Sequence, residues 1–363
     1  MDAPSSELII SRPHHEVRSH AEAWLAEVRR RADAALGIAL AVADEAGRDA
    51  RWQTGRHAAF EYAMRPGKRF RAALLTSAYA LARGERTVPK GVWEFAAGIE
   101  LLHLFMLVHD DIADRADLRR GGVTMHRMLG AGKKGDDLGL VMGDYFFARA
   151  IEVMLSAADQ PHAGRVVQYY LAICRETAAG QYLDIDLGDA PLSSVTLFQT
   201  LKIAQLKTAR YGFVAPLVAG AELAGAPRER VDLLERIGRH LGLAYQMADD
   251  LIGLFGDPRV AGKPTDADFV EGKRTYPVIA AYVRAPDKAR QEMTALWAGE
   301  RTSETQLAQA RALVEKHGGR AATERLVAHS QRAAQQLIAQ LPNIDGCRCL
   351  LEHLVASLGA RST

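Results

Sequence analysis

Residues 99–114 read IELLHLFMLVHDDIAD, an apolar run that ends in three aspartates. The first ten of these residues are almost wholly apolar and predict a deeply buried helix. Charged carboxylates rarely lie at the end of a buried helix. Asp110 and Asp114 are four residues apart and share one helical face, with Asp111 beside them. Like charges at this spacing cost roughly a few tenths of a kcal/mol, and a bound cation would turn that repulsion into a binding site.

A second aspartate pair follows another apolar helical stretch, at residues 237–248. The pair is Asp249 and Asp250, and the stretch before it contains the polar Gln246. One such pair would be typical of a solvated helix end, whereas two pairs at the ends of buried helices favour a cation site. Oxygen ligands without a cysteine or histidine pattern suit a hard cation. Mg²⁺ typically binds through one or two carboxylates, waters and the phosphates of a substrate.

Basic residues occur in compact groups that would complement a phosphorylated substrate. Lys68, Arg69 and Arg71 follow Pro66 and Gly67 and precede an apolar run. The pattern predicts a helix start, where backbone N–H groups also favour anions, with Lys68 and Arg71 on one face. Each cation alone is typical of a solvated charge, so the grouping with the aspartates carries the prediction. The other members of this set are Arg119, Arg120, Lys207 with Thr208, Lys263 and Lys273.

The rest of the chain predicts an all-α fold. Apolar, alanine-rich segments of about 12 to 25 residues alternate with short glycine- and proline-containing breaks. Alternating β-branched and aromatic runs are missing from the sequence, so strands have almost nowhere to form. The pattern predicts a single large bundle of ten or more helices around a central apolar pocket, spanning residues 16–363. Residues 1–15 lack a period and are expected to be a disordered tail.

Composition limits the possible partners and compartment. The 363 residues include 46 Lys and Arg against 44 Asp and Glu, so the net charge of +2 does not suggest nucleic-acid binding. Three cysteines fit a reduced, cytoplasmic protein without a disulfide framework. We expect no secretory signal and no segment long and apolar enough to span a membrane.

The motifs resemble those of the trans-isoprenyl diphosphate synthases, or polyprenyl synthetases, over about residues 50–363. The family's first aspartate-rich motif, DDxxD, matches residues 110–114, and its arginine pair matches Arg119 and Arg120. Its glycine-glycine-lysine-arginine segment matches residues 67–71, with Pro66 replacing the first glycine. Further matches, in the family's order, are Lys207-Thr208, Tyr245-Gln246-Met247-Ala248-Asp249-Asp250 and Glu271-Gly272-Lys273-Arg274-Thr275-Tyr276-Pro277.

The resemblance implies an all-α fold of the isoprenoid synthase type and a prenyl transfer reaction. It implies that Asp110, Asp114 and Asp249 ligate three Mg²⁺ ions, with Asp111 and Asp250 supporting them. It places Arg119, Lys207 and Lys263 on an allylic diphosphate, with Lys273 closing over the site. The same resemblance assigns isopentenyl diphosphate to Lys68, Arg71, His103 and Arg120, and further diphosphate or supporting contacts to Thr208, Gln181, Asp184 and Gln246.

Two features of the sequence bear on departures from the family and on product length. Gly253 stands where a third aspartate is common, and Asp257 is the next carboxylate. Phe105 and Met106 lie four and five residues before Asp110, hence ~6 to 7.5 Å below it along a helix. A lone aromatic residue at this position, Phe105, resembles the pattern found in enzymes that make the twenty-carbon geranylgeranyl diphosphate. Phe105 and Met106 could also simply belong to the core.

The sequence is compatible with several alternatives. The product could be farnesyl diphosphate or a longer chain. A class I terpene cyclase shares the bundle and the DDxxD motif but needs no second diphosphate site. A non-catalytic subunit of a heteromeric synthase would not need an intact first motif. The resemblance also implies a homodimer.

Overall fold

The computed structural model describes residues 14–41, 47, 49–157, 162–256, 267–299, 301 and 303–361. Residues 1–13 of the expected tail lie outside the described residues. The first helix begins at His14, so the prediction that the tail extends to residue 15 is wrong for its last two residues. Lys263 and Asp257 also lie outside the described residues.

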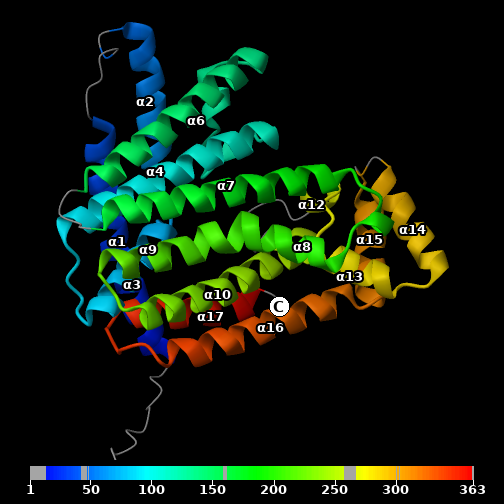
Figure 1. Ribbon diagram of the computed structural model, residues 1–363. Coiled ribbons are helices and arrows are strands. Elements are labelled where there is room, and N and C mark those ends of the chain that lie inside the picture. Colours follow the sequence, from blue (N-terminus) through cyan, green and yellow to red (C-terminus); the bar gives the residue numbers. More distant parts are fainter. Residues whose placement is uncertain are drawn as a thin grey trace, which may run out of the picture.

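The all-α prediction is confirmed: the described ranges are dominated by helices (Figure 1). They are α1 (His14–Ala41), α2 (Ala50–Met64), α3 (Phe70–Arg83), α4 (Lys90–Ala113), α5 (Met125–Leu129), α6 (Gly132–Leu155), α7 (Ala163–Gly188), the 3₁₀ turn η2 (Leu192–Ser194), α8 (Leu197–Ile203), the π-helix η3 (Ala204–Val214), α9 (Ala215–Leu223), α10 (Arg228–Phe255), α12 (Ala267–Val270), α13 (Tyr276–Arg284), α14 (Asp287–Ala298), α15 (Glu304–Lys316), α16 (Gly319–Ile338) and α17 (Cys347–Arg361).

Helix α4 lies in the core, as its apolar sequence predicts. It packs along α6, and Gly98 makes the close approach possible, because a Cβ there would lie 2.4 Å from Cγ of Met154. Within the described ranges, α4 alone is long and apolar enough to cross a membrane, with a mean hydropathy of 1.5 in its best window. The prediction that no segment reaches this limit is therefore wrong, because the window average outweighs the interrupting Glu94 and Glu100. Of that window, 72% is buried by the rest of the protein.

The long helices α7, α10 and α16 run across the molecule in stacked layers (Figure 1), with η3 packed against both α7 and α10. Glycine makes these contacts close. A Cβ on Gly242 of α10 would lie 2.5 Å from Cα of Ala209, and one on Gly180 of α7 would lie 2.7 Å from N of Lys207. Helices α7 and α10 therefore pack against η3 from two sides. This packing fixes the backbone that carries Lys207 and Thr208.

Buried apolar side chains form two clusters. The larger one spans the helices from α1 to α10 and continues into α16 and α17. The smaller one joins α13, α14 and α15 at one end of the molecule (Figure 1) and includes Phe269 and Trp297. Helix α10 contributes to both, since Met247 lies in the larger cluster and Leu254 in the smaller. The second aspartate pair of α10 therefore lies between two packed regions.

One short β-hairpin follows α4 in the described chain, where the sequence had suggested almost no strands. Strand β1 (Leu118–Arg119) pairs antiparallel with β2 (Gly122–Val123). The two connecting residues, Arg120 and Gly121, have φ values of 54° and 73°. Two positive φ values in a two-residue loop match the turn that suits the twist of a hairpin. The hairpin escaped prediction because a turn of this kind leaves no periodic signal.

Candidate active site

Three adjoining cavities form the site, and Thr208 lines all three. We call them the tail cavity, which is the most apolar of the three, the basic cavity and the acidic cavity. The tail cavity has a volume of about 630 Å³ and lies beside Phe105 and Met106. The basic cavity, about 460 Å³, lies beside Lys68 and Arg71. The acidic cavity has a volume of about 360 Å³. It is lined by the carboxylates of Asp110, Asp184, Asp249, Asp250 and Asp268, together with Lys207, Lys273 and Gln246.

The acidic cavity brings Asp110 of the first motif together with Asp249 and Asp250 of the second, 139 or more residues away in the chain. The third predicted metal ligand, Asp114, is exposed and is not part of the lining. Asp110 lies in the last turn of α4, and Asp114 caps that helix by donating its backbone N–H to the carbonyl of Asp110 at 2.8 Å. Burial raises the pKa of Asp110, while Lys207 lowers it and Asp114 raises it. Asp110 therefore lies within the field of a neighbouring like charge, as its spacing from Asp114 predicts.

The donor set of the acidic cavity fits a divalent cation that is shared with a diphosphate. Among the described residues, no three aspartate, glutamate, histidine or cysteine side chains are grouped closely enough to hold a metal ion by themselves. Carboxylate oxygens from α4 and α10 nevertheless line one cavity with Lys207 and Lys273. Mg²⁺ commonly takes one or two carboxylates and completes its shell with water and phosphate oxygens. The arrangement matches that mode of binding rather than a closed protein cage.

Asp111 has a different environment from its two neighbours in the motif. It is fully buried, accepts a hydrogen bond from the hydroxyl of Tyr62 at 2.9 Å, and accepts another from Nε of Arg119 at 2.7 Å. Burial and the charge of Asp111 raise the pKa of Tyr62, so this hydroxyl remains a donor. Asp111 thus holds Arg119 in place. The contribution of Tyr62 was missed, because nothing in the local pattern of α2 marks it.

The hairpin places Arg119 against the buried Asp111 and Arg120 in the lining of the basic cavity. Arg65, just after α2, anchors the hairpin by donating to the carbonyl of Val123 at 2.7 Å. Its guanidinium lies against Gly122, where a Cβ would approach it to 2.6 Å. With the hairpin so fixed, Arg119 binds Asp111, and Arg120 lines the basic cavity over Gly67.

The π-helix η3 supplies Lys207, Thr208 and Tyr211 to the site. Nζ of Lys207 donates to Asp184 of α7 at 2.7 Å. The hydroxyl of Thr208 donates to Gln246 at 2.5 Å, and Gln246 donates in turn to Asp250 at 2.7 Å. This chain links η3 to the second aspartate pair. Wide helical turns of this kind are frequent at functional sites.

The basic cavity contains polar donors that have no hydrogen-bond partner in the described part of the protein. They are Nε of Arg71, Nη1 of Arg120 and Nδ1 of His103, all buried. Burial lowers the pKa of His103 well below its usual value, and the nearby Arg71 and Arg120 lower it further, so the ring is neutral. Unpaired buried donors are costly, and an anion with several oxygens would satisfy them together.

Lys68 and Arg71 both line this cavity, but not by sharing a helical face. Helix α3 begins at Phe70, so Lys68 lies in the segment before the helix and Arg71 in its first turn. The prediction of a common face is therefore wrong. The prediction assumed that the helix includes Lys68. Arg69 instead caps the helix with a left-handed backbone, φ 45° and ψ 45°, so the helical repeat does not extend back to Lys68.

The tail cavity lies beneath Asp110 and is lined mainly by apolar groups. Phe105 and Met106 line it as their spacing predicts, and Gln181 and Cys174 of α7 line it too. Phe105 packs against Phe147 of α6, with ring centroids 5.2 Å apart. Phe147 was not singled out from the sequence, because its position opposite Phe105 depends on how α6 packs on α4.

The carboxylate of Asp268 was also missed, although it lies just before the predicted motif at residues 271–277. It lies 3.5 Å from Nζ of Lys273, and Glu271 lies 2.7 Å from the same nitrogen. Burial acts to lower the pKa of Lys273, but Asp268 and Glu271 outweigh it, so the net shift is upward. Lys273 therefore carries its charge at the rim of the acidic cavity.

A helical bundle with an acidic cavity, a basic cavity and an apolar tail cavity defines a class of enzyme that acts on phosphorylated substrates with apolar tails. The model of the polyprenyl synthetase family matches residues 55–314. A geranylgeranyl diphosphate synthase of Mycobacterium tuberculosis is 36% identical over 279 residues, which cover 76% of this chain and 75% of the relative. A farnesyl diphosphate synthase of Mycobacterium bovis is 36% identical over 259 residues, 70% of this chain and 68% of the relative.

The solved structures agree with the sequence relatives. A geranylgeranyl pyrophosphate synthase from Corynebacterium glutamicum, complexed with isoprenyl diphosphate and magnesium, has a TM-score of 0.81 and 26% identity. The match covers 94% of this chain and 99% of that one. The chain belongs to the polyprenyl synthetase family, the trans-isoprenyl diphosphate synthases, and is a transferase of prenyl groups.

Proposed function

We propose that this prenyltransferase condenses isopentenyl diphosphate with an allylic diphosphate, either dimethylallyl, geranyl or farnesyl diphosphate. The observation that carries the proposal is the meeting of two separate polar cavities and one apolar cavity at Thr208. A terpene cyclase would need only one diphosphate cavity. A non-catalytic subunit would not need the full set of charged side chains that lines the acidic and basic cavities.

The acidic cavity suits the allylic diphosphate. Asp110, Asp114 and Asp249 would hold Mg²⁺, which we propose binds as three ions shared with the diphosphate. When bound, Mg²⁺ supplies positive charge to the departing diphosphate oxygens. Arg119, fixed by Asp111, and Lys207, fixed by Asp184, would bind the same diphosphate. Lys273 lies at the rim of this cavity, and Lys263 is assigned to the diphosphate by family resemblance only.

The basic cavity suits the diphosphate of isopentenyl diphosphate. Lys68, Arg71 and Arg120 supply the charge, and the unpaired donors of Arg71, Arg120 and His103 supply hydrogen bonds. Because burial, and after it the two arginines, lower the pKa of His103 and keep the ring neutral, the ring can donate from one nitrogen without adding to the repulsion between the cations.

The reaction itself needs no protein nucleophile. The C–O bond of the allylic diphosphate breaks, and its electron pair leaves with the diphosphate. The double bond of isopentenyl diphosphate attacks the resulting allylic cation, and a proton passes from the new carbon skeleton to the departed diphosphate. Cations fixed around the leaving group stabilise the charge that develops. The apolar lining of the tail cavity excludes the water that would quench the cation.

We propose geranylgeranyl diphosphate as the main product, with farnesyl diphosphate or a longer chain as the alternatives. Asp110, Phe105, Met106 and Phe147 all line the tail cavity. Two packed aromatic rings form a stiff wall, whereas Met106 is adaptable. The growing tail would stop where Phe105 and Phe147 meet.

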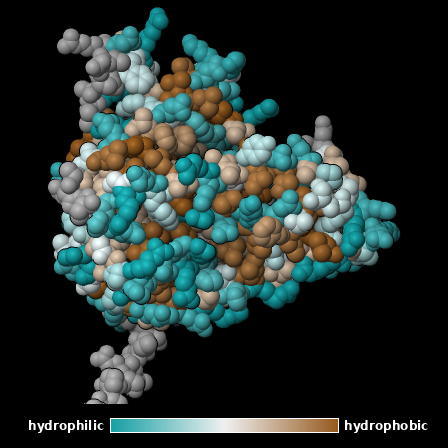
Figure 2. All heavy atoms as spheres, viewed as in Figure 1, coloured by the Kyte–Doolittle hydropathy of each residue, from teal (hydrophilic) through white to brown (hydrophobic). Residues whose placement is uncertain are grey.

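A homodimer in the cytoplasm completes the proposal. Leu138, Leu140 and Val141 of α6 are exposed by 39%, 42% and 56%. Exposed apolar groups on one helix are typical of a protein interface. The face in Figure 2 is mostly hydrophilic, with apolar patches between the polar residues. Sedimentation of the purified chain would test the assembly.

The purified chain tests the function directly. It is incubated with labelled isopentenyl diphosphate, Mg²⁺ and a primer of five, ten or fifteen carbons, and the dephosphorylated products are then sized. We expect extension to twenty carbons. Failure to extend any primer would refute the proposal, and a cyclic hydrocarbon formed without isopentenyl diphosphate would indicate a cyclase.

A further inference from the structure

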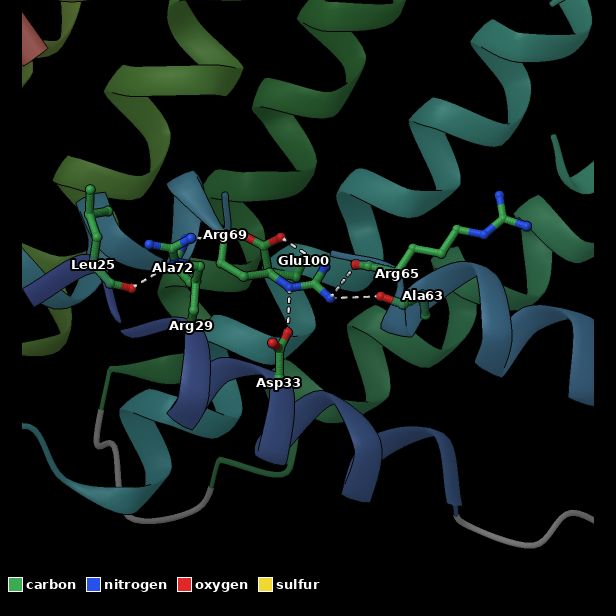
Figure 3. A network of polar contacts seen from close by, with 8 residues as sticks. All are labelled: Leu25, Arg29, Asp33, Ala63, Arg65, Arg69, Ala72 and Glu100. Carbon is green, nitrogen blue, oxygen red and sulfur yellow. Dashed lines mark hydrogen bonds and ion pairs between the residues drawn. The ribbon is translucent and has the colours of Figure 1, made fainter. Parts of the chain in front are cut away.

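Arg69 lies between two proposed diphosphate ligands, Lys68 and Arg71, but its side chain is only 1% exposed. Its guanidinium is held by three different elements (Figure 3). Nε donates to Asp33 of α1 at 2.6 Å, and Nη2 donates to the carbonyl of Ala63, at the end of α2, at 2.7 Å. Nη1 lies 3.7 Å from Glu100 of α4. Arg69 therefore ties the wall of the basic cavity to three helices.

The backbone of Arg69 is strained. Its φ of 45° and ψ of 45° lie in the left-handed region, which residues other than glycine rarely adopt. Such a conformation persists only where the surroundings hold it. Here it turns the chain between Lys68, which precedes α3, and Arg71, which lies in the first turn of the helix. The spacing of these two cations around the basic cavity depends on this turn.

Asp33 is the carboxylate that fixes the rotation of the guanidinium. The Glu100 contact, at 3.7 Å, is longer than a hydrogen bond, and Nη1 of Arg69 has no hydrogen-bond partner in the described structure. Glu100 instead accepts from the backbone N–H of Ala72 at 3.2 Å. Asp33 is 41% exposed, whereas the Arg69 side chain is 1% exposed, so replacing Asp33 by a neutral residue leaves a buried guanidinium with one fewer charged partner.

We propose that Asp33 is a positioning residue for the diphosphate of isopentenyl diphosphate, acting through Arg69 on Lys68 and Arg71. The proposal rests on the function proposed above and deepens it. It gives α1 a role in substrate binding, although α1 precedes residues 55–314, which carry the family match. A helix remote in sequence would thus set the affinity of one substrate and leave the other untouched.

The variant Asp33→Asn tests the proposal. Without the charged acceptor, the turn at Arg69 loosens, and we expect the KM for isopentenyl diphosphate to rise about tenfold. The KM for the allylic primer and kcat at saturation should stay within about twofold of the wild type, since the acidic cavity is unchanged. Direct calorimetric titration with isopentenyl diphosphate should show the same loss of affinity. Asp33→Glu, which keeps the charge, should recover part of it.

The matched control is Glu22→Gln on the same helix. Glu22 loses the same charge but pairs only with the exposed Arg18, at 2.7 Å, in the contacts described. We expect wild-type constants from it. Equal affinity for isopentenyl diphosphate in Asp33→Asn and wild type would overturn the positioning role alone. Equal losses for both substrates would also overturn it, and wild-type protein that does not bind isopentenyl diphosphate would overturn the proposed function as well.

Discussion

The carboxylate of Asp268 occupies the space into which a side chain at Gly253 would project. A Cβ on Gly253 would lie 2.0 Å from Oδ2 of Asp268. Asp268 also lies 3.5 Å from Nζ of Lys273, and its charge raises the pKa of Asp250. The family commonly has a third aspartate at the position of Gly253. In this chain the carboxylate of Asp268, from α12, lies where the side chain of that aspartate would begin.

Restoring the family residue should therefore harm this enzyme. Gly253→Asp forces Asp268 away and places two carboxylates together, and we expect kcat to fall by about tenfold or more. The double variant Gly253→Asp with Asp268→Gly removes the clash and should regain most of the activity. Wild-type kcat in the single variant would show that the two positions are independent.

Loss of the Tyr62 hydroxyl should cost stability. Tyr62→Phe leaves an oxygen of the fully buried Asp111 without this donor, and we expect the free energy of unfolding to fall by about 1 to 3 kcal/mol. Urea denaturation measures the change. Tyr182→Phe, at a side chain that is 69% exposed, is the control and should leave stability unchanged. An unaltered midpoint for Tyr62→Phe would contradict the role assigned to this bond.

Shortening Phe105 should lengthen the product. Phe105→Ala removes one of the two packed rings that close the tail cavity, so we expect the main product to gain at least one five-carbon unit. Chromatography of the dephosphorylated products measures this. Phe198→Ala, at a side chain that is 73% exposed, should leave the product distribution unchanged. The same chain length from Phe105→Ala would place the limit elsewhere.

Asp249 should be needed for metal-dependent turnover. Asp249→Ala removes a proposed Mg²⁺ ligand from the acidic cavity, and we expect kcat to fall by about 10² or more. The activity of the wild type should vanish with a chelator and return with added Mg²⁺. Asp287→Ala, at a side chain that is 95% exposed, should behave as wild type. Near-normal turnover by Asp249→Ala would exclude it as a ligand.

The stability of the metal-free protein should depend on Asp250. Burial raises the pKa of Asp250 well above its usual value, and Asp268 raises it further. The folded protein therefore binds this proton more tightly than the unfolded chain does, so the resulting stabilisation is fully present below the unfolded pKa. It is lost as pH rises through the folded pKa.

We therefore expect Asp250→Asn to raise Tm at pH 8 by roughly 2 °C or more, with a chelator present. The difference should shrink as the pH is lowered and the wild-type carboxyl becomes protonated. Thermal unfolding across a pH series measures it, with Asp287→Asn as the exposed control. A lower Tm for Asp250→Asn at pH 8 would contradict the assignment.

The sequence was informative about features that depend on local pattern. Helical periodicity indicated the all-α bundle, and the apolar run before Asp110 indicated a buried helix that ends in charge. Spacing alone also placed Phe105 and Met106 below the aspartates, and both line the tail cavity. These predictions hold because a helix repeats every 3.6 residues, so positions three or four apart are neighbours in any context.

Tertiary packing alone decided which distant residues meet. Phe147 faces Phe105 because Gly98 lets α6 approach α4, and Asp268 reaches the cavity because Gly253 leaves room for it. Asp33 holds Arg69 across 36 residues, and the left-handed turn at Arg69 separates Lys68 from the helix that carries Arg71. Contacts of this kind depend on how helices pack and on backbone strain that the surroundings maintain, and neither leaves a periodic trace in the chain.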